Sequence, residues 1–363
     1  MLYDLISSFV AQFRYITFRT ALAAVVSFIL VFIFTPMLIR LFKKKSVLER
    51  TEKKDSERLC ELHQHKASVP TMGGFAIIGS ILITTALFAR LDNIFVLYAI
   101  LLTFGLLTLG FIDDLVKLRA KKDGGISKLS KLLGQGLIGL AVGFGLWYYF
   151  QKYHLYYPSA LTLYIPILKE SVELGRWYPF LVALVIMAAS NAVNLTDGLD
   201  GLATGCLIMA GLAYLIIIYI VGRVDYTDYL QIPYIPGSGE LTIFMAAFVG
   251  ACLGFLWFNS FPAEIFMGNV GSIALGGALG FVAVTGKQEL TLFLVGAIFV
   301  IDTLSVIIQI ISFRFWGKRV FKIAPIHHHF QFNGIAEPKI TLRFWIVAAI
   351  LAILTLATLK IEL

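Results

Sequence analysis

The sequence contains few charged residues for its length. Asp, Glu, Lys and Arg make up 14% of its 363 residues, whereas about a quarter of a soluble domain is charged. Hydrophobic residues make up 59% of the chain, and this excludes the ordinary soluble classes. Because apolar runs of about 20 residues can cross the hydrocarbon core as helices, the composition predicts an all-α integral membrane protein.

Cysteine is also scarce, and several common motifs are missing. Cys60, Cys206 and Cys252 are far apart in the sequence, so neither a disulfide framework nor a zinc-binding spacing is present. There is no GxxxxGK[ST] motif, which argues against a P-loop ATPase. The first apolar run is long and ends in a basic cluster, so nothing near the N-terminus resembles a cleaved signal peptide.

The net charge of +8 does not indicate a nucleic-acid-binding protein. No basic domain with interleaved aromatic residues is visible, and the Lys and Arg residues lie beside apolar segments instead. In that position they set the membrane topology and can contact anionic headgroups or phosphates. We therefore expect membrane lipid as a partner and no nucleic acid.

Apolar segments long enough to span a membrane recur along the whole chain, which we expect to form one multi-pass domain over residues 1–363. If they alternate in direction, the loops on one face carry most of the basic residues, and the positive-inside rule places that face in the cytoplasm and both termini outside. Residues 1–20 could form an interfacial helix, and the outer loops 151–177 and 222–240 show no chemistry. We predict about ten transmembrane helices, at 21–41, 72–90, 94–112, 132–150, 178–196, 201–221, 241–258, 267–286, 290–312 and 342–360. The basic loops are 42–71, 113–131, 197–200, 259–266 and 313–341.

The stretch NAVNLTDGLDG, residues 191–201, lies between two of these apolar segments. Spaced amides and acids are rare at such a place unless they hold something polar. On one helix, Asn194, Asp197 and Asp200 would share a face and could point together at one charged ligand. A polar loop that only joins two helices is the alternative, although such loops usually contain Gly, Ser and Lys.

Asp113 and Asp114 end the third predicted span, in the sequence GFIDDLVK. Adjacent acids repel each other unless a cation or a basic group lies nearby. Because neighbouring side chains on a helix diverge by about 100°, only one of the two should face a given ligand. Lys117 follows one turn later and can bind a phosphate or pair with Asp113. A solvated helix end is the alternative interpretation of this motif alone.

Three further segments place polar or aromatic side chains on the same predicted face. HQHKASVPTMGG (63–74) offers a lysine for phosphate, and NSFPAEIFMGNVGS (259–272) offers two amides and a ring that could stack on a base. PIHHHF (325–330) contains consecutive histidines, which suit hydrogen bonds to substrate better than zinc binding. The residues concerned are Lys66, Asn259, Phe266, Asn269, His327, His328 and His329. Carboxylates with substrate phosphates are the usual surroundings of Mg²⁺, so the combination predicts phosphoryl transfer at the membrane surface.

Five motifs resemble, in order and spacing, those of the phospho-N-acetylmuramoyl-pentapeptide-transferases, which belong to the polyprenyl-phosphate sugar-1-phosphate transferases. The similarity covers essentially the whole chain. NAVNLTDGLDG followed by PIHHH is highly specific, whereas FIDD or PTMGG alone would not be. The motifs are PTMGG (70–74), FIDD (111–114), NAVNLTDGLDGLA (191–203), FMGNVGS (266–272) and APIHHHF (324–330).

The resemblance implies a ten-helix enzyme of the bacterial inner membrane, commonly a homodimer, with a cytoplasmic active site and periplasmic termini. Its reaction would transfer phospho-N-acetylmuramoyl-pentapeptide from UDP-MurNAc-pentapeptide to undecaprenyl phosphate with Mg²⁺ as cofactor. The products would be lipid I and UMP, in the first membrane step of peptidoglycan synthesis.

The resemblance also implies roles for individual residues. The acids nearest the lipid phosphate would be Asp113, the expected base, and Asp114. Lysines on the phosphate side would be Lys66, Lys117 and Lys131, and the nucleotide-side motif would be Asn194, Asp197 and Asp200. Uridine contacts would be Asn259 and Phe266, and the substrate loop would carry His327, His328 and His329. Asp197 is also expected to be catalytic, and the expected metal ligands are Asp113, Asp197 and the residue at position 269.

The chain departs from the family pattern at two places. Residues 67–69 read Ala-Ser-Val where the family has a Gly-Thr pair, which is tolerable. More seriously, the family motif FMGD supplies a metal-binding aspartate, and this chain has Asn269 instead. We therefore expect a weakened enzyme.

Two other functions fit parts of the pattern. A related transferase that uses UDP-N-acetylglucosamine is the main alternative, but PIHHH and TMGG argue against it. A lipid or ion transporter would also contain intramembrane acids, but it should lack a uridine site.

Overall fold

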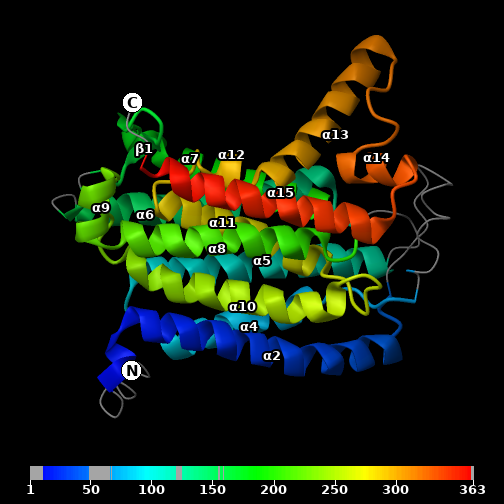
Figure 1. Ribbon diagram of the computed structural model, residues 1–363, viewed down its shortest axis with the longest axis horizontal. Coiled ribbons are helices and arrows are strands. Elements are labelled where there is room, and N and C mark those ends of the chain that lie inside the picture. Colours follow the sequence, from blue (N-terminus) through cyan, green and yellow to red (C-terminus); the bar gives the residue numbers. More distant parts are fainter. Residues whose placement is uncertain are drawn as a thin grey trace.

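The computed structural model describes residues 11–48, 66, 68–119, 125–153, 156, 157 and 159–360, and these form a bundle of long helices (Figure 1). In chain order the main helices are α2 (Ile16–Lys44), α4 (Gly74–Phe88), α5 (Ile94–Arg119), α6 (Lys128–Lys152), α7 (Tyr178–Thr196), α8 (Leu202–Val221), α10 (Leu241–Asn259), α11 (Gly268–Thr285), α13 (Ala297–Trp316) and α15 (Glu337–Thr358). Shorter elements are η1 (Ala11–Arg14), η4 (Gly175–Trp177), α9 (Val224–Leu230), η5 (Ser238–Glu240), α12 (Leu292–Val295) and α14 (Ile326–Phe332).

The expectation of about ten transmembrane helices is confirmed. Among the described residues, nine helices are long and apolar enough to cross a membrane, and α4 is a shorter apolar helix between two of them. The predicted segments coincide with these helices, because each long apolar run can satisfy its backbone groups in a membrane only by forming a helix.

The first helix corrects one prediction. Residues 16–20 are not part of an interfacial helix, since they form the first turn of α2; residues 1–10 lie outside the described part. Arg19 is 1% exposed, and its guanidinium donates to both carboxylate oxygens of Glu240 at 2.8 and 2.7 Å. An ion pair that satisfies a buried charge therefore ties α2 to η5.

Helices α10 and α11 occupy the centre of the bundle. Their most apolar windows are 83% and 94% buried, and α11 packs against α5 and α7 while α10 packs against α2 and α8. Helix α11 is rich in glycine, and a Cβ on Gly276 would lie 2.5 Å from the Ala189 carbonyl oxygen of α7. Small residues allow membrane helices to approach this closely.

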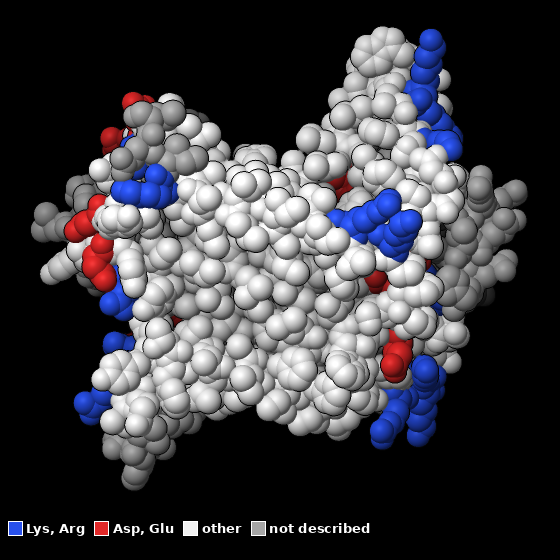
Figure 2. All heavy atoms as spheres, viewed as in Figure 1, with Lys and Arg blue, Asp and Glu red and all other residues white. Residues whose placement is uncertain are grey.

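The two ends of the bundle differ. Both chain termini lie at one end, and α14 and the tip of α13 lie at the other (Figure 1). Figure 2 shows Lys and Arg side chains at both ends and a broad surface without them in between, as expected for a protein that spans a bilayer. Which end faces the cytoplasm stays a prediction.

The loops predicted to be external contain structure that the sequence did not predict. Strands β1 (Thr162–Ile165) and β2 (Glu170–Glu173) form an antiparallel pair that aligns Thr162 with Glu173. Lys287, which follows the predicted span 267–286, is fully buried. Its ammonium lies 4.0 Å from Glu289 Oε1 and donates to the Thr162 carbonyl at 3.3 Å. Burial lowers the pKa of Lys287 to about 8 and raises the pKa of Glu289 to about 7.

Candidate active site

Two of the predicted motifs lie side by side. In PTMGG, the Gly73 and Gly74 amides donate to the Phe266 and Met267 carbonyls at 2.8 and 2.9 Å, and the Phe266 amide donates to the Pro70 carbonyl at 2.9 Å. Glycine is required at position 74, because a Cβ there would overlap the backbone of Gly271. The backbone of one motif thus fixes the start of α11.

Helix α5 crosses α11 at a second glycine. A Cβ on Gly110 would overlap the carbonyl of Asn269, so the two helices approach more closely there than other residues would allow. This crossing places the end of α5, with Asp113 and Asp114, against the first turn of α11.

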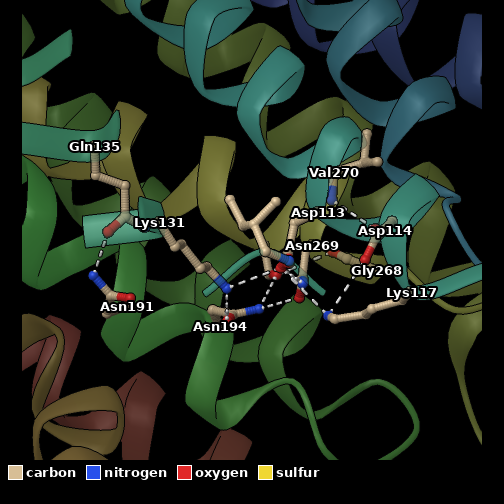
Figure 3. A network of polar contacts seen from close by, with 12 residues as sticks. Asp113, Asp114, Lys117, Lys131, Gln135, Asn191, Asn194, Gly268, Asn269 and Val270 are labelled. Atoms are coloured by element: carbon tan, nitrogen blue, oxygen red, sulfur yellow. Dashed lines mark hydrogen bonds and ion pairs between the residues drawn. The ribbon is translucent and has the colours of Figure 1, made fainter. Parts of the chain in front are cut away.

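Asp113 is the centre of a polar cluster (Figure 3), and it is only 2% exposed. Its Oδ1 accepts the Ile126 amide at 2.9 Å, and its Oδ2 accepts a hydrogen bond from the Asn269 side-chain amide. The ammonium groups of Lys117 and Lys131 lie 3.4 and 3.5 Å from Oδ2. The Asp113 carboxylate is therefore surrounded by hydrogen-bond donors and two ammonium groups.

Asp114 faces a different set of partners, although it is only 6% exposed. Its Oδ2 accepts the Val270 amide at 3.1 Å, and its Oδ1 lies 3.6 Å from the Lys117 ammonium. The two acids accept hydrogen bonds from different groups, but contrary to the expectation that only one would face a given ligand, both lie within 3.6 Å of the Lys117 ammonium. The Lys117 side chain is 44% exposed, so it is the cation of this cluster most open to a ligand.

Two amides link the acids to α7. The Asn194 side-chain amide donates to Asn269 Oδ1 at 2.6 Å and to Ser272 Oγ at 2.9 Å, and its oxygen accepts from Lys131 at 2.8 Å. Figure 3 shows these side chains converging from α5, α6, α7 and α11. The structure therefore brings together Asp113, Asp114, Lys117, Lys131, Asn194 and Asn269.

The prediction that Asn194, Asp197 and Asp200 share one helix face is wrong. Helix α7 ends at Thr196, Asp197 follows with ψ 57°, and Gly201 has φ +72°. Asn194 joins the acid cluster, half-buried Asp197 follows the helix end, and Asp200 turns to a second cluster. Gly198 and Gly201 break the helix because glycine readily adopts turn conformations.

The second cluster is a buried ion triad. Lys66 donates to Asp200 Oδ1 and to Glu337 Oε1, each at 2.6 Å, and the Asp200 amide also donates to Glu337 Oε1 at 2.7 Å. All three side chains are less than 9% exposed. The ammonium of Lys66, predicted to contact a phosphate, is thus engaged by two carboxylates, and Glu337 is a site residue that sequence reasoning missed.

Replacing Lys66 by methionine is expected to destabilise the protein by about 3–5 kcal/mol, because two buried carboxylates would lose their cation. Thermal unfolding of the purified protein would measure this loss. Adding Glu337→Gln should recover part of it, since one negative charge is removed. If Lys66 only contacted a substrate phosphate, the unfolding temperature would not change and only the KM for substrate would rise.

The uridine candidates differ in their surroundings. Asn259 is 3% exposed, accepts from Thr204 at 2.8 Å and donates to the Ile265 carbonyl at 3.0 Å. These bonds hold the loop that carries Phe266. Phe266 is half-buried, with the Lys66 ammonium 5.8 Å from its ring centroid. Of the two, Phe266 is the more accessible to a base.

The three histidines have three different environments. His327 is fully buried, and its Nδ1 lies 2.8 Å from Asp302 Oδ2. His328 pairs with Gln331 at 2.8 Å, and Gln331 donates to Glu337 at 3.4 Å. His329 accepts the Lys322 amide at 3.1 Å. The histidine loop is therefore connected to the ion triad through Gln331.

A metal ion would have to rely on few protein ligands. Within the described ranges, no group of three or more His, Cys, Asp or Glu side chains comes together. Asp113 and Asp114 nevertheless provide two carboxylates, and the side-chain amides of Asn194 and Asn269, each with one oxygen, belong to the same cluster. One or two carboxylates completed by substrate phosphates and water are a typical Mg²⁺ site, so the oxygen chemistry of this cluster fits that ion.

Comparison with known proteins agrees with this arrangement. Glycosyl transferase family 4 matches residues 96–287. The chain is 46% identical to the phospho-N-acetylmuramoyl-pentapeptide-transferase of Citrifermentans bemidjiense over 354 residues, which cover 96% of this chain and 95% of the relative. It is 45% identical to the protein of the same name from Geobacter sp. (strain M21) over 372 residues, covering all of both chains. The chain therefore belongs to the phospho-N-acetylmuramoyl-pentapeptide-transferase family, within glycosyl transferase family 4.

Proposed function

We propose that this membrane protein transfers phospho-N-acetylmuramoyl-pentapeptide from UDP-MurNAc-pentapeptide to undecaprenyl phosphate. A bond forms between a phosphate oxygen of the lipid and the β-phosphorus of the nucleotide sugar. The bond from that phosphorus to the oxygen of UMP breaks, so UMP leaves and lipid I remains. The observation that carries this proposal is the pair of buried acids at the end of α5, surrounded by lysines and amides.

The chain's own residues would act mainly by positioning and by neutralising charge. Two anions must meet in this reaction, and fixed positive groups in a partly dry site stabilise such a transition state. Lys117 and Lys131, beside Asp113, would hold the phosphates, and Asp113 would accept a proton from the lipid phosphate. Asp197 and Asp200 would line the nucleotide side, with Phe266 against the uracil ring.

Mg²⁺ is part of the proposal. Asp113 and Asp114 would hold the ion, with Asp197 and the Asn269 amide oxygen as further ligands. When bound, it would neutralise the diphosphate and polarise its phosphoryl oxygens. The amide at position 269 provides no negative charge, so we expect weak retention of the ion.

The setting of the enzyme is proposed on the same basis. The site end of the bundle would face the cytoplasm, where the nucleotide sugar is, and both termini would face the periplasm of a bacterial inner membrane. A homodimer is the proposed assembly. Labelling of single cysteines placed at the two ends with a membrane-impermeant reagent would test the orientation.

UMP release separates this function from its alternatives. With undecaprenyl phosphate and Mg²⁺, we expect UMP from UDP-MurNAc-pentapeptide and none from UDP-N-acetylglucosamine. The second nucleotide sugar is disfavoured because the relatives carry the name of the first activity. Release from UDP-N-acetylglucosamine alone would support the alternative transferase. No release from either nucleotide sugar, by this chain or by Asn269→Asp, would support a transporter.

Alanine at His327, His328 or His329 is expected to weaken use of UDP-MurNAc-pentapeptide by about 1–3 kcal/mol, the cost of one polar contact. kcat/KM for UMP release would measure it. Because His327 is buried against Asp302, its substitution should also lower thermal stability, whereas that of half-buried His329 should not. Unchanged kcat/KM in all three variants would mean that the cluster is structural.

A further inference from the structure

One acidic side chain lies within a membrane span and has no part in the mechanism above. Asp302 is 0% exposed, in helix α13. Ionisable groups inside membrane spans are rare and usually have a functional partner. Among the described residues, the side-chain partner of Asp302 is His327, which is also 0% exposed, with 2.8 Å between Oδ2 and Nδ1.

This contact determines how the imidazole is presented. A carboxylate only accepts, so Nδ1 of His327 must carry a hydrogen, and Nε2 becomes the ring atom that points away from α13. Acidic partners fix the tautomer and orientation of histidines in this way in metal and catalytic sites.

The free ring atom points at the nucleotide-side turn. A Cβ on Gly198 would lie 2.5 Å from His327 Nε2 and 3.3 Å from His328 Nε2, so both rings converge on the glycine between Asp197 and Asp200. In the described part of the chain, His327 Nε2 is buried without a hydrogen-bond partner. Buried polar atoms normally have one, which points to a partner supplied by a ligand at this turn.

We propose that Asp302 is a positioning residue for recognition of the nucleotide sugar. It fixes His327 so that the substrate loop is held against Gly198 and Nε2 is presented to the bound substrate. This inference rests on the proposed function, because the ligand at the turn is UDP-MurNAc-pentapeptide.

The test uses the full-length protein in detergent and UDP-MurNAc-pentapeptide as the probe. Asp302→Asn keeps the shape, but its amide can offer either oxygen or NH₂ to Nδ1 and no longer dictates the tautomer. We expect its Kd, measured by calorimetry, to rise about tenfold, as for the loss of one buried hydrogen bond. In the Asn269→Asp background, KM should rise by a similar factor while kcat changes less than about threefold.

Two further variants separate positioning from general damage. His327→Asn can still donate to Asp302 but lacks an atom equivalent to Nε2, so it should weaken binding equally. Asp302→Asn should then add nothing in the His327→Asn background, because residues that act as one unit are not additive. Thr303→Val is the matched control. Among the described residues, the Thr303 hydroxyl donates to the Phe299 carbonyl of its own helix at 2.8 Å, so its replacement should leave Kd unchanged.

The outcomes distinguish the inference from the function on which it rests. If Kd is unchanged in both Asp302→Asn and His327→Asn, the inference is overturned but the proposed function is not. The same holds if Asp302→Asn still raises Kd tenfold in the His327→Asn background. Absence of binding by the parent protein and of UMP release by Asn269→Asp would overturn the proposed function, and the inference with it.

Discussion

Replacing Asn269 by aspartate is expected to raise Mg²⁺-dependent UMP release by about 100-fold or more, because Lewis-acid stabilisation by a bound metal is worth several kcal/mol. In the present chain, the Asn269 amide donates to Asp113 Oδ2. An aspartate would instead place a second carboxylate opposite Asp113. Two facing carboxylates repel each other unless a cation lies between them, so the substitution should create a stronger Mg²⁺ site.

The same substitution gives a readout that does not depend on turnover. Without Mg²⁺, Asn269→Asp should unfold at a lower temperature than the parent, because like charges face each other in a buried cluster. Adding Mg²⁺ should stabilise the variant more than the parent, since an ion that binds only the folded state shifts unfolding by mass action.

Asn333→Asp is the matched control for this change. Asn333 is exposed and accepts from Lys322, so the variant carries the same added charge outside the acid cluster. It should respond to Mg²⁺ like the parent. Equal Mg²⁺-dependent turnover in the parent and in Asn269→Asp would contradict the argument and would leave the metal with Asp113, Asp114 or Asp197.

Replacing Asp113 by asparagine is expected to abolish UMP release while the protein stays folded. The carboxylate is the focus of two ammonium groups and two amide donors. Asparagine keeps the volume and one acceptor oxygen but loses the negative charge and the ability to take a proton. The assay is best run in the Asn269→Asp background, where the expected starting rate is higher.

Asp225→Asn is the matched control for this second change. Asp225 lies in α9, near Arg223 at 3.4 Å, with a side chain that is 63% exposed, so the same substitution there should leave turnover intact. Near-normal turnover in Asp113→Asn would show that Asp113 is not the base and would leave that role to Asp114 or Asp197. If Asp113→Asn still binds the nucleotide sugar, its loss of UMP release is a defect in the chemical step and not in binding.

The spans were predictable because the signal that defines them is local. A run of apolar residues must form a helix in a membrane whatever surrounds it. The acid cluster was predictable in part: Asp113, Asp114 and Lys117 are neighbours on one helix, and their mutual contacts follow from helical spacing. Asn194 and Asp200 were wrongly predicted to share a helix face, because the helical spacing was assumed to continue through Gly198. The helix ends before that residue.

Glu337 and Asp302 were missed for different reasons. Glu337 contacts Lys66, from which it is separated by 271 positions in the sequence. An acid in the first turn of a helix is also common, because it interacts favourably with the helix dipole. Asp302 did give a signal, since a lone acid inside an apolar span is a functional hypothesis by default. Its partner could not be predicted, because only packing brings α14 back against α13.

The wide spacing of the cluster in the sequence has a consequence for biosynthesis. Asp113 and Asn269 are 156 positions apart, so at about 5–20 residues per second α11 leaves the ribosome roughly 8–30 s after α5. The positive partners come first: Lys117 is made with the acids, and Lys131 follows on α6. The amides of α7 and α11 come later. A nascent chain therefore covers its acid pair with cations of its own before the helices that complete the pocket have been synthesised.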